Sequence, residues 1–260
     1  MGGEAGTPDT ARWYMNLAWA AAALGDLGRC FAAMAAGERL AERFGSLRRR
    51  RSIELQRVAE RYWTGRWREA VAVVDAMVAG GERSYLASEC RLWRGRIHLA
   101  GGRLEDALED ARAAHDLARE AGDPQDLHPT RAFLARALLA GGRRDEAAAV
   151  AERLLAGLDG GGALVPDLGA DLGMVLADLG IPAAALDRLD IPPSPWLTAA
   201  RALAAGDPLA AAATYAAIGS RPDEADARLA AVRLLEQRGR PAEAGEQRAA
   251  ARAFYASAAG

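Results

Sequence analysis

One short motif recurs along this chain and constrains its fold more than any other feature. Each copy consists of a glycine, four residues of mixed type and then a small residue. Seven copies occur, with glycines roughly 26 to 40 residues apart, at Gly25, Gly65, Gly102, Gly142, Gly180, Gly206 and Gly239. Self-similarity at a period of roughly 20 to 50 residues is typical of solenoids, in which each unit packs on its neighbours. We therefore expect a repetitive scaffold that holds partners.

The residues around each glycine predict a helical hairpin. Alanine-rich segments with helical apolar spacing precede and follow the glycine, which tolerates the left-handed conformation that ends a helix. Acidic residues, and prolines such as Pro208 and Pro241, fall early in the second helix, where both are favourable. The small residue, for example Ala107 or Ala147, lets the two helices approach closely. The sequence therefore predicts seven stacked hairpins.

The composition favours a helical chain and excludes several classes of catalytic site. Of 260 residues, 51% are hydrophobic, and alanine, leucine, arginine and glutamate abound, which favours helix. The net charge of −2 gives no global field that would attract nucleic acid. All 33 basic residues are arginine, which excludes the lysines of Walker A motifs, kinases and Schiff-base enzymes. Cys30 and Cys90 are expected to be buried free thiols.

No long uncharged apolar run and no signal peptide is found in the sequence. We therefore expect a cytoplasmic protein without a membrane span.

The glycine-rich and proline-rich segments divide the chain into units. Residues 1–9 are predicted to be a disordered leader, and four hairpins fill residues 10–156. A glycine-rich break at 157–163 follows, and three further hairpins occupy residues 164–257. A regular superhelix is expected in the first four hairpins, with a change of curvature beyond them.

Two details of this division depend on prolines. The fourth hairpin is expected to begin near Pro129, which places His128 in a loop. The fifth is expected to turn at Gly180 between two helices and to end at the prolines that follow Ile191.

With the turns placed, the units resemble tetratricopeptide repeats. That family has a bulky residue followed by a small one in the first helix of each unit, and an alanine early in the second helix. The matching positions are Leu17-Ala18, Leu134-Ala135 and Leu172-Gly173 in first helices, and Ala107, Ala147 and Ala211 in second helices. Gly95 also fits, although Arg94 stands where the family has leucine. The resemblance implies a right-handed, all-α superhelical solenoid of about seven hairpins.

A narrower resemblance rests on two stretches, residues 199–207 and 219–225. They are similar to the C-terminal repeat regions of bacterial signalling ATPases, including MalT-like regulators and cyclase-linked proteins. Most spacings here exceed the 34 residues of the general family, and the family's terminal proline survives only loosely, at Pro124. The resemblance implies a role in bacterial signalling or transcription control.

In the tetratricopeptide family, first helices line a concave groove. Mapping by distance from each turn glycine places six candidate contact residues on or beside that face: Asn16, Trp19, Tyr62, Trp93, Arg96 and Arg136. Aromatic rings supply contact area and arginine supplies forked hydrogen bonds, so this set suits a peptide that carries acidic groups. The alternative is that the aromatic residues pack between repeats as core.

No sequence pattern supports a catalytic or metal-binding site. His98, His115 and His128 lack metal-ligand or catalytic spacing, and no GxSxG motif occurs, so we expect no catalytic residue, no metal and no cofactor. The Arg48-Arg49-Arg50-Arg51 run is either a contact for an acidic partner or nucleic acid, or the solvated start of a helix.

The sequence thus predicts a non-catalytic protein-binding or peptide-binding module. Two alternatives remain open, a small-molecule sensor with a pocket near 157–163, and a hydrolase that uses His98 or His128 beside a nucleophile. Phe254 and Tyr255 near the end of the chain would form an edge for homodimerisation if they were unburied.

Overall fold

The computed structural model of the protein describes residues 10–44, 47–81, 86–158, 166–189 and 192–259. These residues form thirteen α-helices and one 3-10 helix and contain no β-strand, which confirms the predicted all-α class. The elements are α1 (Thr10–Ala23), α2 (Leu27–Arg43), α3 (Leu47–Thr64), α4 (Trp67–Ala79), α5 (Leu86–Ala100), α6 (Leu104–Ala121), α7 (Pro124–Ala140), α8 (Arg144–Leu158), α9 (Pro166–Leu179), η1 (Ala183–Arg188), α10 (Pro195–Ala204), α11 (Pro208–Ile218), α12 (Arg221–Gln237) and α13 (Pro241–Ala259).

The seven predicted turn glycines all lie between paired helices. Their φ angles fall between 70° and 82°, in the left-handed region where a side chain would be strained. At the first turn, Gly25 N–H donates to Ala22 O and Asp26 N–H donates to Ala21 O, both at 2.9 Å. These are the hydrogen bonds that close a helix through a left-handed glycine. The predicted turn positions are therefore confirmed.

The small residue after each turn glycine is buried in every hairpin except the fifth. In that hairpin Ala185 is only half-buried, because the second element is the six-residue 3-10 helix η1. The prediction of an α-helix there was wrong. Pro182 precedes η1 and Pro192 follows it closely, which leaves room for only a short helical segment.

The fourth hairpin begins earlier than predicted. α7 starts at Pro124, where the Asp123 side chain accepts a hydrogen bond from Gln125 N at 2.9 Å. An aspartate cap followed by proline at the first helical position is a strong start signal, and it outweighs the cost of Pro129 inside the helix. His128 is therefore buried within a helix and does not lie in a loop.

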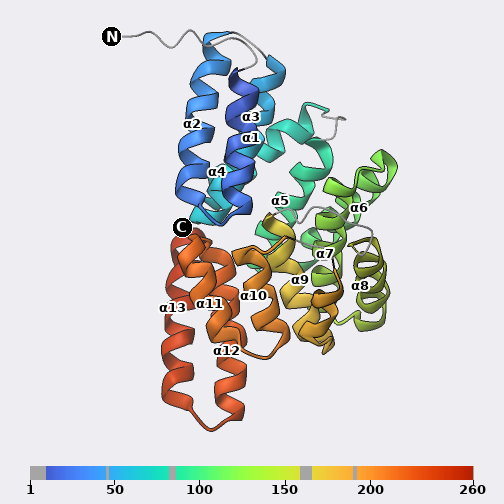
Figure 1. Ribbon diagram of the computed structural model, residues 1–260, viewed down its shortest axis with the longest axis vertical. Coiled ribbons are helices and arrows are strands. Elements are labelled where there is room, and N and C mark those ends of the chain that lie inside the picture. Colours follow the sequence, from blue (N-terminus) through green and yellow to red (C-terminus); the bar gives the residue numbers. More distant parts are fainter. Residues whose placement is uncertain (1–9, 45–46, 82–85, 159–165, 190–191, 260) are drawn as a thin grey trace.

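The first helices of successive hairpins pack against one another, α1 with α3, α3 with α5, α5 with α7 and α7 with α9. The chain then turns back toward its start. In Figure 1, α1–α4 lie directly above α10–α13, while α6–α8 lie to one side. Contacts of α12 with α3 and of α13 with α4 join the two ends of this path.

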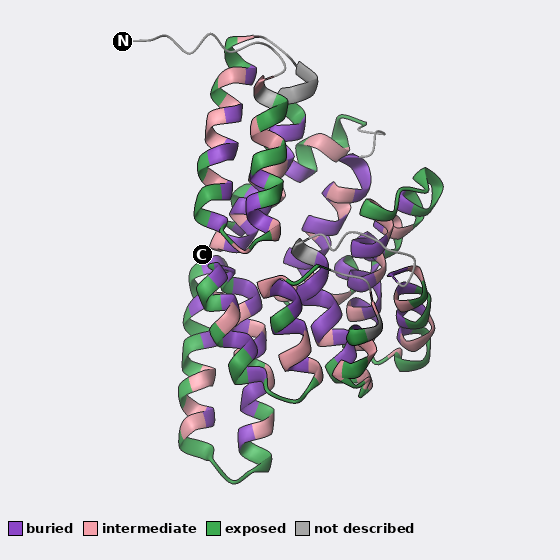
Figure 2. Ribbon diagram, in the orientation of Figure 1, coloured by how far each residue is buried: buried purple, intermediate pink, exposed green. Residues whose placement is uncertain are grey.

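Aromatic side chains form much of the junction between the two ends. Trp196 of α10 donates its indole N–H to Ala22 O in α1 (2.8 Å), and its ring lies 6.1 Å from that of Trp63 in α3. Trp67 of α4 meets Phe254 of α13 edge to face, with centroids 5.5 Å apart. Buried positions accordingly follow the helix faces that look inward (Figure 2).

None of the helices in the described part of the chain is long and apolar enough to cross a membrane.

Candidate functional site

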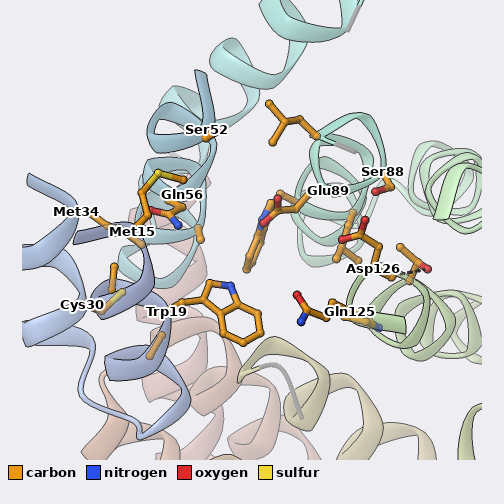
Figure 3. Close-up of a pocket in the computed structure, with 18 of the residues that line it drawn as sticks. Met15, Trp19, Cys30, Met34, Ser52, Gln56, Ser88, Glu89, Gln125 and Asp126 are labelled. Atoms are coloured by element: carbon orange, nitrogen blue, oxygen red, sulfur yellow. Dashed lines mark hydrogen bonds between the residues drawn. The ribbon is translucent and has the colours of Figure 1, made fainter. Parts of the chain in front are cut away.

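A cleft of about 320 Å³, which we call the inner cleft, lies among the first helices of the first four hairpins (Figure 3). It is open near the N-terminal ends of α5 and α7. Ser88 and Glu89 of α5 and Gln125 and Asp126 of α7 line one side of it. Residues of α1, α2 and α3 line the other side, where Met15 and Gln56 lie close together in the view of Figure 3.

Trp19 is the accessible aromatic residue of the inner cleft. Its side chain points toward Gln125 across the opening (Figure 3), and 38% of its surface is exposed. Trp63 and Trp93 also line the cleft but are buried, with 4% and 3% exposed. The cleft therefore has an aromatic floor and one ring that a bound molecule could touch.

Two buried polar atoms of the lining residues have no hydrogen-bond partner among the described residues. They are the indole Nε1 of Trp93 and the side-chain Oε1 of Gln56. The indole N–H can only donate, whereas the amide oxygen accepts. Both atoms are shut off from solvent, so neither is presented to a molecule in the cleft.

The charged side chains that line the inner cleft are acidic. Glu89, Asp123 and Asp126 contribute to its wall, and no arginine is found among the described lining residues. Glu89 and Asp126 also make polar contacts within the protein. Their charge, together with that of Asp123 at the start of α7, favours a cation over an anion.

A second set of residues, which we call the charge cluster, lies further along α5 and α7. Its members are Arg96, Arg136, Asp171, Asp226 and Tyr255, contributed by α5, α7, α9, α12 and α13 respectively. Asp171 Oδ2 accepts from Arg96 Nε (2.9 Å) and Nη2 (2.6 Å), and its Oδ1 accepts from Arg136 Nη1 (2.7 Å). Arg136 also pairs with Asp226, which accepts a hydrogen bond from the Tyr255 hydroxyl. The cluster thus connects the third, fourth and fifth hairpins to the last one.

Burial and ion pairing shift the pKa values of the carboxylates in this region in opposite directions. Burial by itself raises the pKa of Asp171, but the guanidinium groups of Arg96 and Arg136 outweigh it and hold that pKa below its usual value. Asp223 of α12 is buried as well and accepts a hydrogen bond from the Ser220 hydroxyl. Burial raises the pKa of Asp223 to about 7, against the lowering effects of Ser220 and Arg136.

The structure separates the six residues predicted for the groove. Trp19 and Trp93 line the inner cleft, whereas Asn16 is exposed on α1 outside its lining. Tyr62 and Arg96 are each only 3% exposed, and the Arg136 side chain is 14% exposed within its ion pairs. The prediction that Tyr62, Arg96 and Arg136 face an open groove therefore differs from the structure. Their helix face is covered by α9, α12 and α13.

The cleft-lining residues that the sequence did not single out lie nearer the N-termini of the first helices than the predicted residues. Gln56, Glu89, Gln125 and Asp126 are the polar members of this group. Extending the same mapping by one turn from Trp93 would have found Glu89. Gln125 and Asp126 required the true start of α7, which the prediction placed too late.

His98 and His128 are buried and His115 is half-buried, and the Nδ1 atom of each has no hydrogen-bond partner among the described residues. Burial lowers the pKa of His98, His115 and His128, and the neighbouring arginines Arg103 and Arg131 add to that effect. No group of three potential metal ligands is found in the part of the chain that the structure describes.

Both cysteines are buried and free, as predicted. Burial raises the pKa of the Cys30 thiol to about 12, with Glu60 and Asp26 contributing, so this thiol is not activated as a nucleophile.

Several other predictions fall outside the described residues or find no support in them. The leader at 1–9 and residues 159–163 of the glycine-rich break are not described, nor are the side chains of Arg48, Arg49 and Arg50. Phe254 is buried against Trp67 and Tyr255 is half-buried, so the exposed edge on which dimerisation depended is absent.

Comparison of the chain with models of known protein families found no match, and comparison with curated proteins found no relative. The function of the inner cleft is therefore inferred from its geometry.

Proposed function

We propose that this protein is a non-catalytic peptide-binding module and that the inner cleft is its binding site. The observation that carries the proposal is the position of the cleft, on the face where α1, α3, α5 and α7 pack side by side. The cleft combines an accessible ring, Trp19, with polar side chains such as those of Gln125 and Asp126. A site with a mainly apolar floor and few oriented polar groups is typical of specific ligand recognition.

The wider setting of the proposal rests on the resemblance to tetratricopeptide repeats. The packing of successive first helices and the left-handed glycines at the turns support a superhelical repeat architecture. By that resemblance the module belongs to bacterial signalling or transcription control. Its target is then a segment of another protein, and binding would report or control the state of that partner.

The mechanism that we infer is preorganisation. The charge cluster joins α5, α7 and α9 to the last hairpin, which holds the walls of the inner cleft in one arrangement. A preformed site loses less ordering entropy when it binds, so a short segment can bind with useful affinity.

A larger hollow of about 700 Å³ lies between α4, the end of α5 and α13. It is more open than the inner cleft, and none of its described lining residues is an exposed aromatic residue. We therefore place the binding site in the inner cleft.

The proposal is tested by selecting binders from a random peptide library displayed on phage. Selected peptides should bind the wild-type protein in solution and lose at least about tenfold in affinity to the Trp19→Ala variant, since an exposed interface aromatic commonly contributes more than 1 kcal/mol. Trp13→Ala is the matched control, because Trp13 lies on the same helix, is 73% exposed and does not line the cleft.

If no peptide is selected, or if Trp19→Ala and Trp13→Ala weaken binding equally, the proposal fails. A small metabolite that binds in the cleft while no peptide does would instead support the sensor alternative, since about 320 Å³ also lies within the range of small-molecule sites.

A further inference from the structure

The larger hollow, of about 700 Å³, is formed by helices from both ends of the chain. α4 and the end of α5 line two of its sides, and the C-terminal part of α13 lines a third. α13 contacts α4, and the end of α13 lies beside α4 in Figure 1. A molecule bound in this hollow would therefore contact the second, third and last hairpins at once.

Most of the lining is apolar, because its two aromatic residues already use their polar atoms within the protein. Trp67 Nε1 donates to Tyr62 O at 3.1 Å, and the Tyr255 hydroxyl donates to Asp226. The rings of Trp67 and Tyr255 lie 6.0 Å apart. The other apolar lining residues are Val71, Ala72, Ile97, Ala100 and Ala258. These side chains offer contact area to an apolar group.

Two of the three charged residues that line the hollow in the described part of the chain are arginines without a partner. Arg68 and Arg103 are exposed, and neither side chain makes an ion pair or a hydrogen bond among the described residues. The third, Asp75, is paired with Arg94 of α5 at 2.7 Å. The hollow is therefore basic, unlike the acidic inner cleft, and favours an anionic group.

The two free arginines lie at the same end of the hollow. Arg68 is in the first turn of α4, and Arg103 lies in the turn that follows α5. Asp75 lies two helical turns further along α4 and pairs with Arg94, which precedes the end of α5 by nearly two turns. The lining on α4 extends from Trp67 to Asp75, about 12 Å along the helix. The hollow thus combines an apolar length with two guanidinium groups at one end.

We propose that this hollow binds a small amphipathic carboxylate, with its carboxylate at Arg68 and Arg103 and its apolar body along α4 beside Trp67 and Ile97. Guanidinium groups form strong, forked hydrogen bonds with a carboxylate. The volume lies within the range of small-molecule sites. An extended peptide would leave its main-chain amides without partners against the apolar lining. This site is separate from the inner cleft and goes beyond the proposed peptide-binding function.

The experiment measures binding of three ten-carbon probes to the full chain by isothermal titration calorimetry, at concentrations below micelle formation. The probe is decanoate, and its comparators are decanol, which is neutral, and decyltrimethylammonium, which carries the opposite charge. The dissociation constant of decanoate should be at least about tenfold lower than that of decanol, with decyltrimethylammonium weakest. Equal binding of decanoate and decanol, or no heat from decanoate at millimolar concentration, would overturn the proposal.

The assignment of the carboxylate is tested with charge variants. Arg68→Gln and Arg103→Gln should each weaken decanoate by about tenfold and leave decanol unchanged, since each removes one charged hydrogen-bonding partner. Both residues are exposed, so the variants should fold. Arg39→Gln is the matched control, because Arg39 is exposed on α2 and lies outside the lining. If Arg39→Gln weakened decanoate equally, net charge would explain the preference and the proposal would fail.

The assignment of the apolar body is tested by filling the hollow. Ala72 is exposed on α4 and lines the hollow, so Ala72→Trp places a large ring in it without entering the core. This variant should lose at least about tenfold in affinity for decanoate. Ala79→Trp is the control, since Ala79 is exposed on the same helix but is not part of the lining. Wild-type affinity in Ala72→Trp would place decanoate elsewhere and overturn the proposal.

The outcomes of this experiment and of the peptide selection are distinguishable. Loss of peptide binding in Trp19→Ala, with decanoate binding unchanged, would support two separate sites. Selected peptides that lose affinity for Ala72→Trp but keep it for Trp19→Ala would place a protein segment in the hollow and overturn the carboxylate proposal. Failure of decanoate to bind leaves the peptide result for the inner cleft unaffected.

Discussion

The two halves of α5 show how one helix face can serve two purposes. Glu89, Trp93 and Arg96 follow one another at helical spacing and so share a face, as do Pro129 and Arg136 on the neighbouring α7. At the N-terminal end this face is open and forms the inner cleft. At the C-terminal end this face is covered, and its arginines are neutralised by ion pairs with carboxylates of α9 and α12.

The difference lies in what packs on top of each end. The chain turns back after α9, and its last hairpin contacts α3 and α4. It also pairs with α7 through Asp226 and Arg136, and it faces the end of α5 across the larger hollow. A charged residue on the inner face is therefore not by itself a contact for partners. Whether it recognises a ligand or fastens the fold depends on how far along the helix the covering elements extend.

The largest effect is expected from a substitution of Asp171, the central carboxylate of the charge cluster at the covered C-terminal ends of α5 and α7. Asp171→Leu leaves Arg96 and Arg136 buried without their shared anion, which should lower the free energy of unfolding by about 3–5 kcal/mol. Urea unfolding followed by circular dichroism measures the loss.

An exposed ion pair provides the control for that variant. Asp187→Leu removes a carboxylate 3.2 Å from Arg201, where both side chains are well exposed, and should cost less than about 1 kcal/mol. If the two variants destabilised the protein equally, the charge cluster would not be what fastens the covered end.

A smaller effect is expected where the chain turns back, at the close approach of α9 and α10. A Cβ on Gly173 would lie 2.7 Å from Ala200 Cα, a backbone atom that cannot move aside. Gly173→Ala should therefore destabilise by about 1–3 kcal/mol through overpacking.

Gly245 in α13 is the matched case, because a Cβ there meets nothing within 4 Å. Gly245→Ala should leave stability unchanged or raise it by up to about 1 kcal/mol, since alanine favours helix. Thermal unfolding of both variants compares their stabilities. A Gly173→Ala variant as stable as the wild type would show that α9 and α10 can move apart without loss of stability.

A pH-dependent effect is expected from the buried Asp223 at the covered end. The pKa of Asp223 is raised in the folded state to about 7, so its stabilising protonation is complete below the unfolded value of 3.8 and is lost as pH rises through 7. Each pKa unit between the two states corresponds to about 1.4 kcal/mol. Asp223→Asn cannot ionise and should be more stable than wild type at pH 8 by at least about 1 kcal/mol.

The neighbouring Asp171 has the opposite effect on how the free energy of unfolding depends on pH. Its pKa is lowered in the folded state, so its contribution is present above the unfolded value and is lost as pH falls below it. The unfolding free energies of wild type and Asp223→Asn should therefore diverge as pH rises from about 4 to 7 and stay a constant amount apart above pH 7. Parallel profiles would mean that Asp223 ionises normally.

Much of the fold could be predicted from local signals in the sequence. Turn glycines such as Gly102 and Gly142 identified the hairpins because a left-handed backbone is cheap only for glycine. Buried alanines such as Ala107 and Ala147 marked close helix contacts for a similarly local reason. The two errors, at η1 and at the start of α7, arose where prolines and a capping aspartate competed within a few residues.

The candidate site could be predicted only in part, because recognition depends on exposure. Trp19 and Trp93 were placed on the correct face, and both line the inner cleft. Arg96 and Arg136 were placed on that face by the same reasoning, yet their partners Asp171 and Asp226 lie roughly 75 and 90 residues away along the chain. No periodicity within one hairpin carries information about so distant a carboxylate.

By itself, the sequence determined the helices, the turns and the face that each first helix presents, because these depend on interactions within about four residues or within one hairpin. The tertiary structure alone decided that the last hairpins return to cover the C-terminal ends of α5 and α7. That return depends on the sum of small packing angles over the whole path of helices. It left an acidic, aromatic cleft open where the sequence had indicated a basic groove.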